Sequence, residues 1–317
     1  MASPDKPRLA NGYMRATRAI WNRLPKSFRS TPPLVAFGNH VHSLVLKSAG
    51  RGQSHGTFFL RNRAELELMR RLAARISDGS RLDIGVFGCS KGAEVYSIAW
   101  TLKAAPPNLK INIHASDISP DIVQFARQGV YSSRDPGLCE TIDQDGVLGA
   151  GKLHWDTQRD QLNVSIFDRM SEIEKDEIFD RDGDCMKVKP QIKEGISWCC
   201  ADAGDPNLVS VVGRQDIVVA NRFLCHVDPA SAERILRNLV SVLKPGGFLF
   251  VSGIDLDVRT RVALDMKWKP VTELMKEVYE GDPSLRSGWP LEYWGTEPFQ
   301  ARRRNATIRY ASAFQIS

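Results

Sequence analysis

The sequence predicts an α/β fold in which a mainly parallel sheet is covered by helices on both faces. Segments with strand and helix patterns alternate over roughly residues 83–253, as in chains that build parallel sheets through helical crossovers. The first predicted strand ends in a glycine-containing turn, and the second ends in an acidic residue. Ligands of such sheets bind beyond the carboxyl ends of the strands, so both features are expected at one crevice.

The composition is that of a globular protein. The chain has 317 residues, of which 42% are hydrophobic and 25% are charged, and this mixture argues against collagen, coiled-coil and disordered classes. Its apolar runs are too short to span a bilayer, and its N-terminus lacks the apolar core of a signal peptide. The six cysteines are irregularly spaced, without a CxxC pair. The sequence therefore predicts no metal site and no disulfide framework, and it favours a cytoplasmic location.

Positive charge is concentrated near the N-terminus. Residues 1–31 contain seven basic side chains and one acid, so they carry the whole net charge of +6. Residues 11–24 predict a short amphipathic helix. Its expected apolar face consists of Tyr13, Ile20, Trp21 and Leu24, with Thr17 completing that face. The helix either docks on the core as a solvated element or binds an acidic partner or an anionic membrane surface. Residues 302–304 form a second basic spot, but no nucleic-acid-binding module is present in the sequence.

The expected elements follow in order along the chain. Loops are predicted at Pro32-Pro33 and over 48–56. A helix begins at Arg63, and its expected buried residues are Leu66, Met69, Leu72 and Ile76. The expected strands are 83–88, 111–116, 196–200, 216–220, 248–253 and a final one at 307–315. The expected helices between them are 93–103, 120–128 and 229–243. Ser119 and Gly129 suit the two ends of the helix at 120–128.

Two domains are expected. A basic helical N-terminal extension covers residues 1–56, and the main domain covers 57–317. Within the main domain, residues 132–195 interrupt the alternation and predict an insert or subdomain with a hairpin at Asp182-Gly183. Residues 254–317 form a C-terminal segment on the acceptor side. Its aromatic and proline residues are expected either to wall an acceptor pocket or to pack in the core; they are Trp289, Pro290, Tyr293 and Trp294.

The turn after the first strand carries the clearest chemistry. Gly88 and Gly92 allow close approach of the backbone to a ligand, and backbone N–H groups point outward where the next helix begins. The Gly-x-x-x-Gly spacing matches neither the dinucleotide fingerprint nor the P-loop. Asp117, after the next strand, is suited to accept hydrogen bonds from both ribose hydroxyls. A nucleoside ligand is expected, as in NAD enzymes and S-adenosylmethionine (SAM) methyltransferases; the alternative is a tight turn with a helix-capping aspartate.

Five ordered segments resemble the CheR-type methyltransferases, the family that methylates chemotaxis receptor glutamates. The segments are TFFLR (57–61), DIGVFGCSKGAEVYSIAW (83–100), ASDISPDIVQFARQGVY (115–131), CMKVKPQIKEGISWCCADAGD (185–205) and DIVVANRFLCHVDPASAERILRNLVSVLKPGGFLFVSG (216–253). The resemblance implies a Rossmann-like class I methyltransferase with SAM as cofactor and S-adenosylhomocysteine (SAH) as product. It covers about residues 57–253.

The same resemblance assigns roles by position. Thr57 and Arg61 would close over the methionine end of SAM, with Arg61 near the acceptor. Glu94 would hold the amino group, Asp117 the ribose and Asp202 the adenine amino group. The full set of implied cofactor residues is Thr57, Gly88, Cys89, Ser90, Gly92, Glu94, Asp117, Ile118, Ala201, Asp202 and Asn221. The implied catalytic residues are Arg61, Arg222 and His226.

Several positions depart from the family pattern on the acceptor side. The family's Arg-Asn pair appears in the order Asn221-Arg222, and His226 replaces a tyrosine. The resemblance implies methylation of a protein glutamate carboxylate, which needs a positive neighbour but no base. A hydroxyl acceptor on a glycan or small molecule is the alternative, with His226 as base. The second alternative is a SAM-binding adaptor without catalysis.

Overall fold

The computed structural model describes residues 6–76, 81–103, 109–135 and 164–317. The chain divides into two compact units, residues 1–50 with 283–300 and residues 51–282 with 301–317. The boundary between the units therefore falls at residue 50, whereas the sequence predicted it at residue 56. Residues 283–300, which were expected in the main domain, belong to the first unit. The second unit contains the sheet and the site.

The first unit is helical. Its elements are α1 (Lys6–Arg23), α2 (Lys26–Arg29), α3 (Pro32–Ser48) and α13 (Pro283–Gly288). Trp21 is 1% exposed, and its ring meets that of Trp289 edge to face at 5.2 Å between centroids. The expected apolar face of the first helix is partly wrong, because Tyr13 and Ile20 are 43% and 58% exposed. Thr17 and Trp21, which were expected on the same face, are buried.

The predicted loop at Pro32-Pro33 is also wrong. Pro32 is the first residue of α3, and Thr31 precedes it in an extended conformation. Proline is well accommodated at this position, because the first helical residues have no intrahelical partner for an N–H group. The pair of prolines therefore begins a helix here.

The second unit is built on a seven-stranded sheet with the order β6-β2-β1-β7-β8-β10-β9. The strands are β1 (Arg81–Phe87), β2 (Lys110–Asp117), β6 (Ile196–Cys200), β7 (Gln215–Asn221), β8 (Leu243–Ser252), β9 (Lys269–Pro270) and β10 (Ala313–Gln315). The first five pair in parallel, and β10 is antiparallel to both of its neighbours. The predicted, mainly parallel α/β sheet is thus confirmed.

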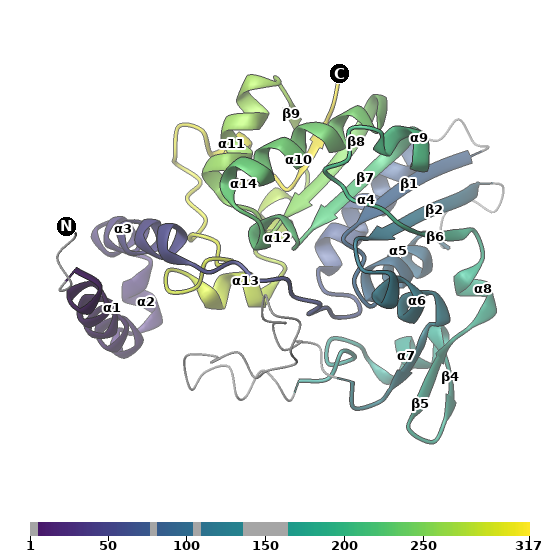
Figure 1. The fold of residues 1–317 in the computed structure, drawn as a ribbon, viewed down its shortest axis with the longest axis horizontal. Coiled ribbons are helices and arrows are strands. Elements are labelled where there is room, and N and C mark those ends of the chain that lie inside the picture. Colours follow the sequence, from purple (N-terminus) through teal and green to yellow (C-terminus); the bar gives the residue numbers. More distant parts are fainter. Residues whose placement is uncertain (1–5, 77–80, 104–108, 136–163) are drawn as a thin grey trace. The chain divides into compact units, whose positions relative to one another are not determined.

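Alternate residues of the central strands enter two hydrophobic cores on opposite faces of the sheet, as the period of two in a strand requires. Ile217 and Val219 of β7 pack in one core, and Val218 and Ala220 pack in the other. The first face is covered by α4 (Arg63–Ile76) and α5 (Ala93–Leu102), and the second by α10 (Pro229–Ser241) and α11 (Leu256–Asp265) (Figure 1). This burial on both faces explains the continuous apolar runs of the strands.

The other helices of the second unit are shorter. They are α6 (Pro120–Gln128), α7 (Glu172–Ile178), α8 (Pro190–Lys193), α9 (Leu208–Val212), α12 (Met275–Tyr279) and α14 (Ala306–Tyr310). Gly129 ends α6 in the left-handed conformation, as predicted, but Ser119 makes no side-chain capping bond. The final expected strand is partly wrong, because residues 307–310 belong to α14 and only residues 313–315 form β10.

The expected insert contains a small antiparallel sheet in the order β3-β5-β4. Its strands are β3 (Val130–Ser132), β4 (Phe179–Asp182) and β5 (Cys185–Val188), and the predicted hairpin at Asp182-Gly183 is confirmed. An aromatic cluster joins this sheet to the main core through Phe59, Tyr131, Phe167 and Phe179. Residues 136–163 of the expected insert lie outside the described residues. No described helix is both long and apolar enough to cross a membrane.

Candidate active site

A cavity of about 200 Å³ lies at the carboxyl ends of β1, β2 and β7. Strand-end residues line it together with the segment that precedes α4. The lining residues are Gln53, Ser54, His55, Gly56, Thr57, Arg61, Gly88, Cys89, Ser90, Glu94, Ser116, Asp117, Ile118, Ala201, Asp202, Ala203, Asn221, Arg222, Phe223, His226, Val227 and Ile235. The crevice predicted from the parallel sheet is therefore present.

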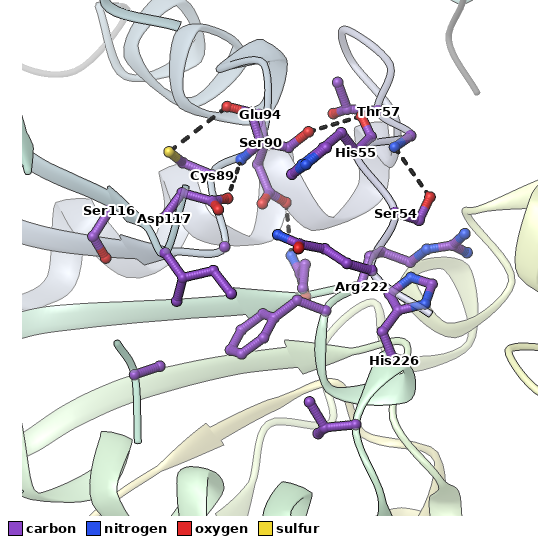
Figure 2. Close-up of a pocket in the computed structure, with 18 of the residues that line it drawn as sticks. Ser54, His55, Thr57, Cys89, Ser90, Glu94, Ser116, Asp117, Arg222 and His226 are labelled. Atoms are coloured by element: carbon purple, nitrogen blue, oxygen red, sulfur yellow. Dashed lines mark hydrogen bonds between the residues drawn. The ribbon is translucent and has the colours of Figure 1, made fainter. Parts of the chain in front are cut away.

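One end of the cavity is formed by the turn after β1 and the last residue of β2 (Figure 2). The backbone N–H of Ser90 donates to Asp117 Oδ2 at 2.9 Å, and the N–H of Ser119 donates to Oδ1 at 3.3 Å. Gly88 has a φ of +68°, and a Cβ at this residue would lie 2.7 Å from the ring of Phe223. A side chain at Gly88 would therefore disturb the turn that orients Asp117.

Glu94 reaches the cavity from the first turn of α5, where it accepts a hydrogen bond from Asn221 Nδ2 at 2.8 Å (Figure 2). The other amide proton of Asn221 goes to Glu65 Oε1 at 2.6 Å, and Asn221 Oδ1 accepts from the Ser252 hydroxyl at 2.7 Å. Burial raises the pKa of Glu94. A carboxyl group in this position is suited to pair with a cationic ligand group.

Two arginines also line the cavity. Arg222, in the left-handed conformation with a φ of 65°, is 3.4 Å from Asp282 Oδ2. Asp282 also pairs with Arg169 at 3.1 Å. Arg61 Nη2 donates to the carbonyl of Gly56 at 2.9 Å, and burial together with Arg222 lowers its pKa to about 10. Arg61 is therefore a cation at neutral pH, and it lines the same cavity as Glu94.

His226 lies beside Arg222 and away from Asp117 (Figure 2). Burial, followed by the positive charge of Arg222, lowers the pKa of His226 to about 4. Its imidazole is therefore neutral near pH 7, with a proton on only one of its two ring nitrogens. Burial also lowers the pKa of His55, which lines the same cavity.

The structure brings together all but one of the residues implied by the resemblance. Gly92 does not line the cavity; it lies behind the turn, in contact with Trp198 and Ala126. Asn221 lines the cavity, but both of its amide protons are used by Glu65 and Glu94. The residues Trp289, Pro290, Tyr293 and Trp294 belong to the first unit. Of the two alternatives expected for them, packing in a core is the one observed for Trp289. Trp289 packs on Trp21 within the first unit.

The cysteine thiols and the possible metal ligands were considered as further reactive groups. Burial raises the pKa of the Cys89 thiol, and it raises that of Cys225 to about 11. A thiol in this state is not a nucleophile. In the part of the chain that the structure describes, no cluster of His, Cys, Asp and Glu is arranged to hold a metal ion.

Sequence reasoning missed Glu65 and Asp282. Glu65 has a detectable signal, because it precedes Met69 by four residues and Leu72 by seven, which puts an acid on the buried face of α4. Asp282 has none, because its partners Arg169 and Arg222 are 113 and 60 residues away in the chain.

Comparisons with known proteins agree with this geometry. Residues 55–145 match the model of the CheR methyltransferase SAM-binding domain, and residues 172–251 match a general methyltransferase domain. The first match contains the turn at Gly88, Glu94 and Asp117, so the resemblance predicted from the motifs is confirmed.

Relatives are distant. A chemotaxis protein methyltransferase of Vibrio parahaemolyticus is 26% identical over 168 residues, which are 51% of this chain and 50% of that protein. A probable chemotaxis protein methyltransferase of Rhizobium etli is 24% identical over 261 residues, 75% of this chain and 85% of that one. The chain thus spans about half the length of the Vibrio relative. The N-methyltransferase NodS of Bradyrhizobium japonicum, solved with SAH, aligns over 74% of this chain and 87% of its own, at 14% identity and a TM-score of 0.36.

The sheet and the matched segments define a class I SAM-binding methyltransferase domain. Among such domains, its cofactor-binding part is similar to that of the CheR type. SAM is the cofactor, and the residues fit it: a buried carboxyl group at Glu94 suits an ammonium group, and a backbone-anchored carboxylate at Asp117 suits a diol.

Proposed function

We propose that this chain is a SAM-dependent methyltransferase that transfers the methyl group to an oxygen acceptor. The observation that carries the proposal is one cavity that is lined by Asp117 and Glu94 and also by Arg61, Arg222 and His226. When bound, SAM supplies a methyl group that is already electrophilic on a sulfonium. The protein then has to bind, orient and exclude water, which are the sources of rate in such a transfer.

In this proposal the cofactor is held by residues of strand and helix ends. Asp117 accepts from the ribose hydroxyls, Glu94 pairs with the ammonium group, and Asp202 accepts from the adenine amino group. Ala201, Ile118 and Ser90 line the walls, with Thr57 closing over the methionine end. Ile118 and Asp202 are exposed. The other residues named are buried or half-buried, and they exclude water from the reacting atoms.

The first candidate acceptor is a protein carboxylate, which the chemotaxis relatives favour. Arg61 and Arg222 would hold its oxygens by charge-assisted hydrogen bonds. The second candidate is a hydroxyl group of a glycan or small molecule. The neutral imidazole of His226 favours it, because a hydroxyl must lose its proton and His226 can take it. A SAM-binding adaptor is the third reading.

The acceptors are separated by the chemistry of the product. The protein is incubated with SAM labelled in the methyl group and with either receptor-type acidic helices or glycan and metabolite fractions. Methylated carboxylates are esters that release labelled methanol in mild alkali, whereas methyl ethers are stable. Volatile label supports the carboxylate, and alkali-stable label supports the hydroxyl. Tight SAM binding without label in any fraction would contradict methyl transfer and favour the adaptor.

A further inference from the structure

Glu65 lies behind the cofactor pocket and is joined to it by a single side chain. It is on the buried face of α4 and is 5% exposed. Its Oε1 accepts one amide proton of Asn221 at 2.6 Å, while Glu94 Oε1 accepts the other at 2.8 Å. The same amide nitrogen therefore fixes two carboxyl groups, and the Ser252 hydroxyl fixes the oxygen of that amide at 2.7 Å. Glu94 owes its position in part to a residue that does not line the main cavity.

A second, smaller cavity adjoins this arrangement. It has a volume of about 20 Å³ and shares Arg61, Glu94 and Asn221 with the main cavity. Glu65 lines it, and the Glu65 Oε2 atom is buried without a hydrogen-bond partner among the described residues. A polar space of this size accommodates one water molecule, which would satisfy Oε2.

The charges that face Glu65 come from three other segments. Glu94 of α5 and Asp282 after α12 disfavour its ionised form, whereas Arg61 and the amide of Asn221 favour it. Burial is the largest influence, and together these raise the pKa of Glu65 to about 8. The carboxyl group is therefore mostly protonated at pH 7, next to a carboxyl group that the cofactor is expected to occupy with a cation.

We propose that Glu65 is a positioning residue for the site of the cofactor's ammonium group. Glu65 holds Glu94 through Asn221, and Glu65 gives up its proton when the ammonium group binds. The proposal rests on the assignment of Glu94 to the ammonium group. Pairing of the ammonium with Glu94 removes the repulsion between Glu94 and an ionised Glu65. The O–H bond of Glu65 then breaks, the electron pair stays on the carboxylate, and the proton leaves through the small cavity to the solvent.

Calorimetry of SAH binding tests both halves of the proposal. SAH keeps the ammonium group but is not turned over. Titrations are run at pH 7 in phosphate and in Tris, which have different ionisation enthalpies. The difference in apparent binding enthalpy, divided by the difference in ionisation enthalpy, gives the number of protons released. The native protein should release a fraction of a proton for each SAH bound.

The variants are Glu65→Gln, which keeps an acceptor for Asn221, and Glu65→Leu, which does not. The control is Glu67→Gln, since Glu67 is on the outer side of the same helix and pairs with Arg70 and Arg71.

The expected results separate positioning from simple stability. Glu65→Leu should weaken SAH binding about tenfold, because Glu94 loses its fixed partner. Glu65→Gln should retain the affinity and abolish that part of the proton release which is due to this residue. In turnover assays, Glu65→Leu should raise the KM for SAM and leave kcat at saturating SAM nearly unchanged. Glu67→Gln should match the native protein in every measurement.

A second ligand makes the test specific to the ammonium group. 5′-Methylthioadenosine has the nucleoside but no amino-acid part, so its affinity should be equal in the native protein and in Glu65→Leu. Equal SAH affinity of native protein and Glu65→Leu, or equal proton release of native protein and Glu65→Gln, would overturn the proposal. If Glu65→Leu fails to fold, the proton release of Glu65→Gln decides alone. Absence of SAH binding to the native protein would instead refute the cofactor site.

Discussion

The carboxylate of Asp117 accepts a hydrogen bond from the backbone N–H of Ser90, with 2.9 Å between the two atoms. This bond joins the end of β2 to the turn after β1, so the acid and the turn are one rigid unit. Backbone donors fix the direction of a carboxylate without the entropy cost of ordering a second side chain. Asp117 is therefore oriented before any ligand arrives, and this preorganisation favours the ribose contact proposed for it.

The first prediction concerns this acid. Asp117→Ala should lower the affinity for SAM and SAH by about 100-fold, because two hydrogen bonds to a charged acceptor are lost. Isothermal titration calorimetry measures the effect. The control is Asp121→Ala, in the first turn of α6 but not in the cavity, which should bind normally. Equal affinities of the two variants would contradict the placement of the ribose at Asp117.

The second prediction separates turnover from cofactor binding. Arg61→Ala should reduce kcat more than it raises the dissociation constant of SAM, since Arg61 is proposed to hold the acceptor. A loss of about 100-fold in kcat is expected for a charge-assisted contact made to the reacting group. Arg63→Ala is the control, because Arg63 is exposed and pairs with Glu174. Undiminished turnover of Arg61→Ala would show that the acceptor binds elsewhere.

Most of the fold was predictable from the sequence because it depends on local patterns. The alternation of apolar strand segments with helical segments predicted the five parallel strands, and Gly129 predicted the end of α6. Local patterns failed where proline or β-branched residues fit two structures. Pro32 begins a helix rather than a loop, and residues 307–310 form a helical turn although Thr307 and Ile308 favour strands.

The lining of the cavity was predictable where it follows the ends of strands, and less so where it depends on contacts between distant segments. Gly88, Glu94 and Asp117 lie at positions that the order of strands dictates. By contrast, the ion pairs of Asp282 with Arg169 and Arg222 form between segments that are distant in the sequence. Residue spacing carries no information on such contacts, since they arise only when the sheet and the C-terminal segment have folded.

The third prediction is a pH dependence of stability. The pKa of His226 lies near 4 in the folded protein, below the usual value of about 6.5 for the unfolded chain. The folded state therefore binds fewer protons, and this contribution is fully present above pH 6.5 and lost as the pH falls toward 4.

Urea unfolding at several pH values measures this contribution. The free energy of unfolding should fall less between pH 6.5 and pH 4.5 in His226→Asn than in the native protein, by an amount on the order of 2 kcal/mol. His40→Asn is a matched control at an exposed position. Parallel pH profiles of His226→Asn and native protein would show that the pKa of His226 is the same in the folded and unfolded states.

The last prediction concerns a buried arginine away from the cavity. Arg259 of α11 is 2% exposed and donates to the carbonyls of Val251 and Arg309 at 2.8 and 2.7 Å. It thereby connects β8 with α14, which brings the C-terminal segment onto the sheet. Burial lowers its pKa to about 10, so the guanidinium remains charged near pH 7 and depends on these two acceptors.

Arg259→Met keeps the length and the apolar contacts of the side chain but leaves two buried carbonyls without a donor. The free energy of unfolding should decrease by about 3 kcal/mol, because each unsatisfied group costs on the order of 1–3 kcal/mol. Arg261→Met should cost less than about 1 kcal/mol, since Arg261 forms an exposed ion pair with Glu233. Under conditions in which Arg259→Met is folded, its affinity for SAH should be normal, because Arg259 does not line the cavity. Equal stability of the two variants would mean that water replaces the guanidinium, and that α14 is held to the sheet by its apolar contacts alone.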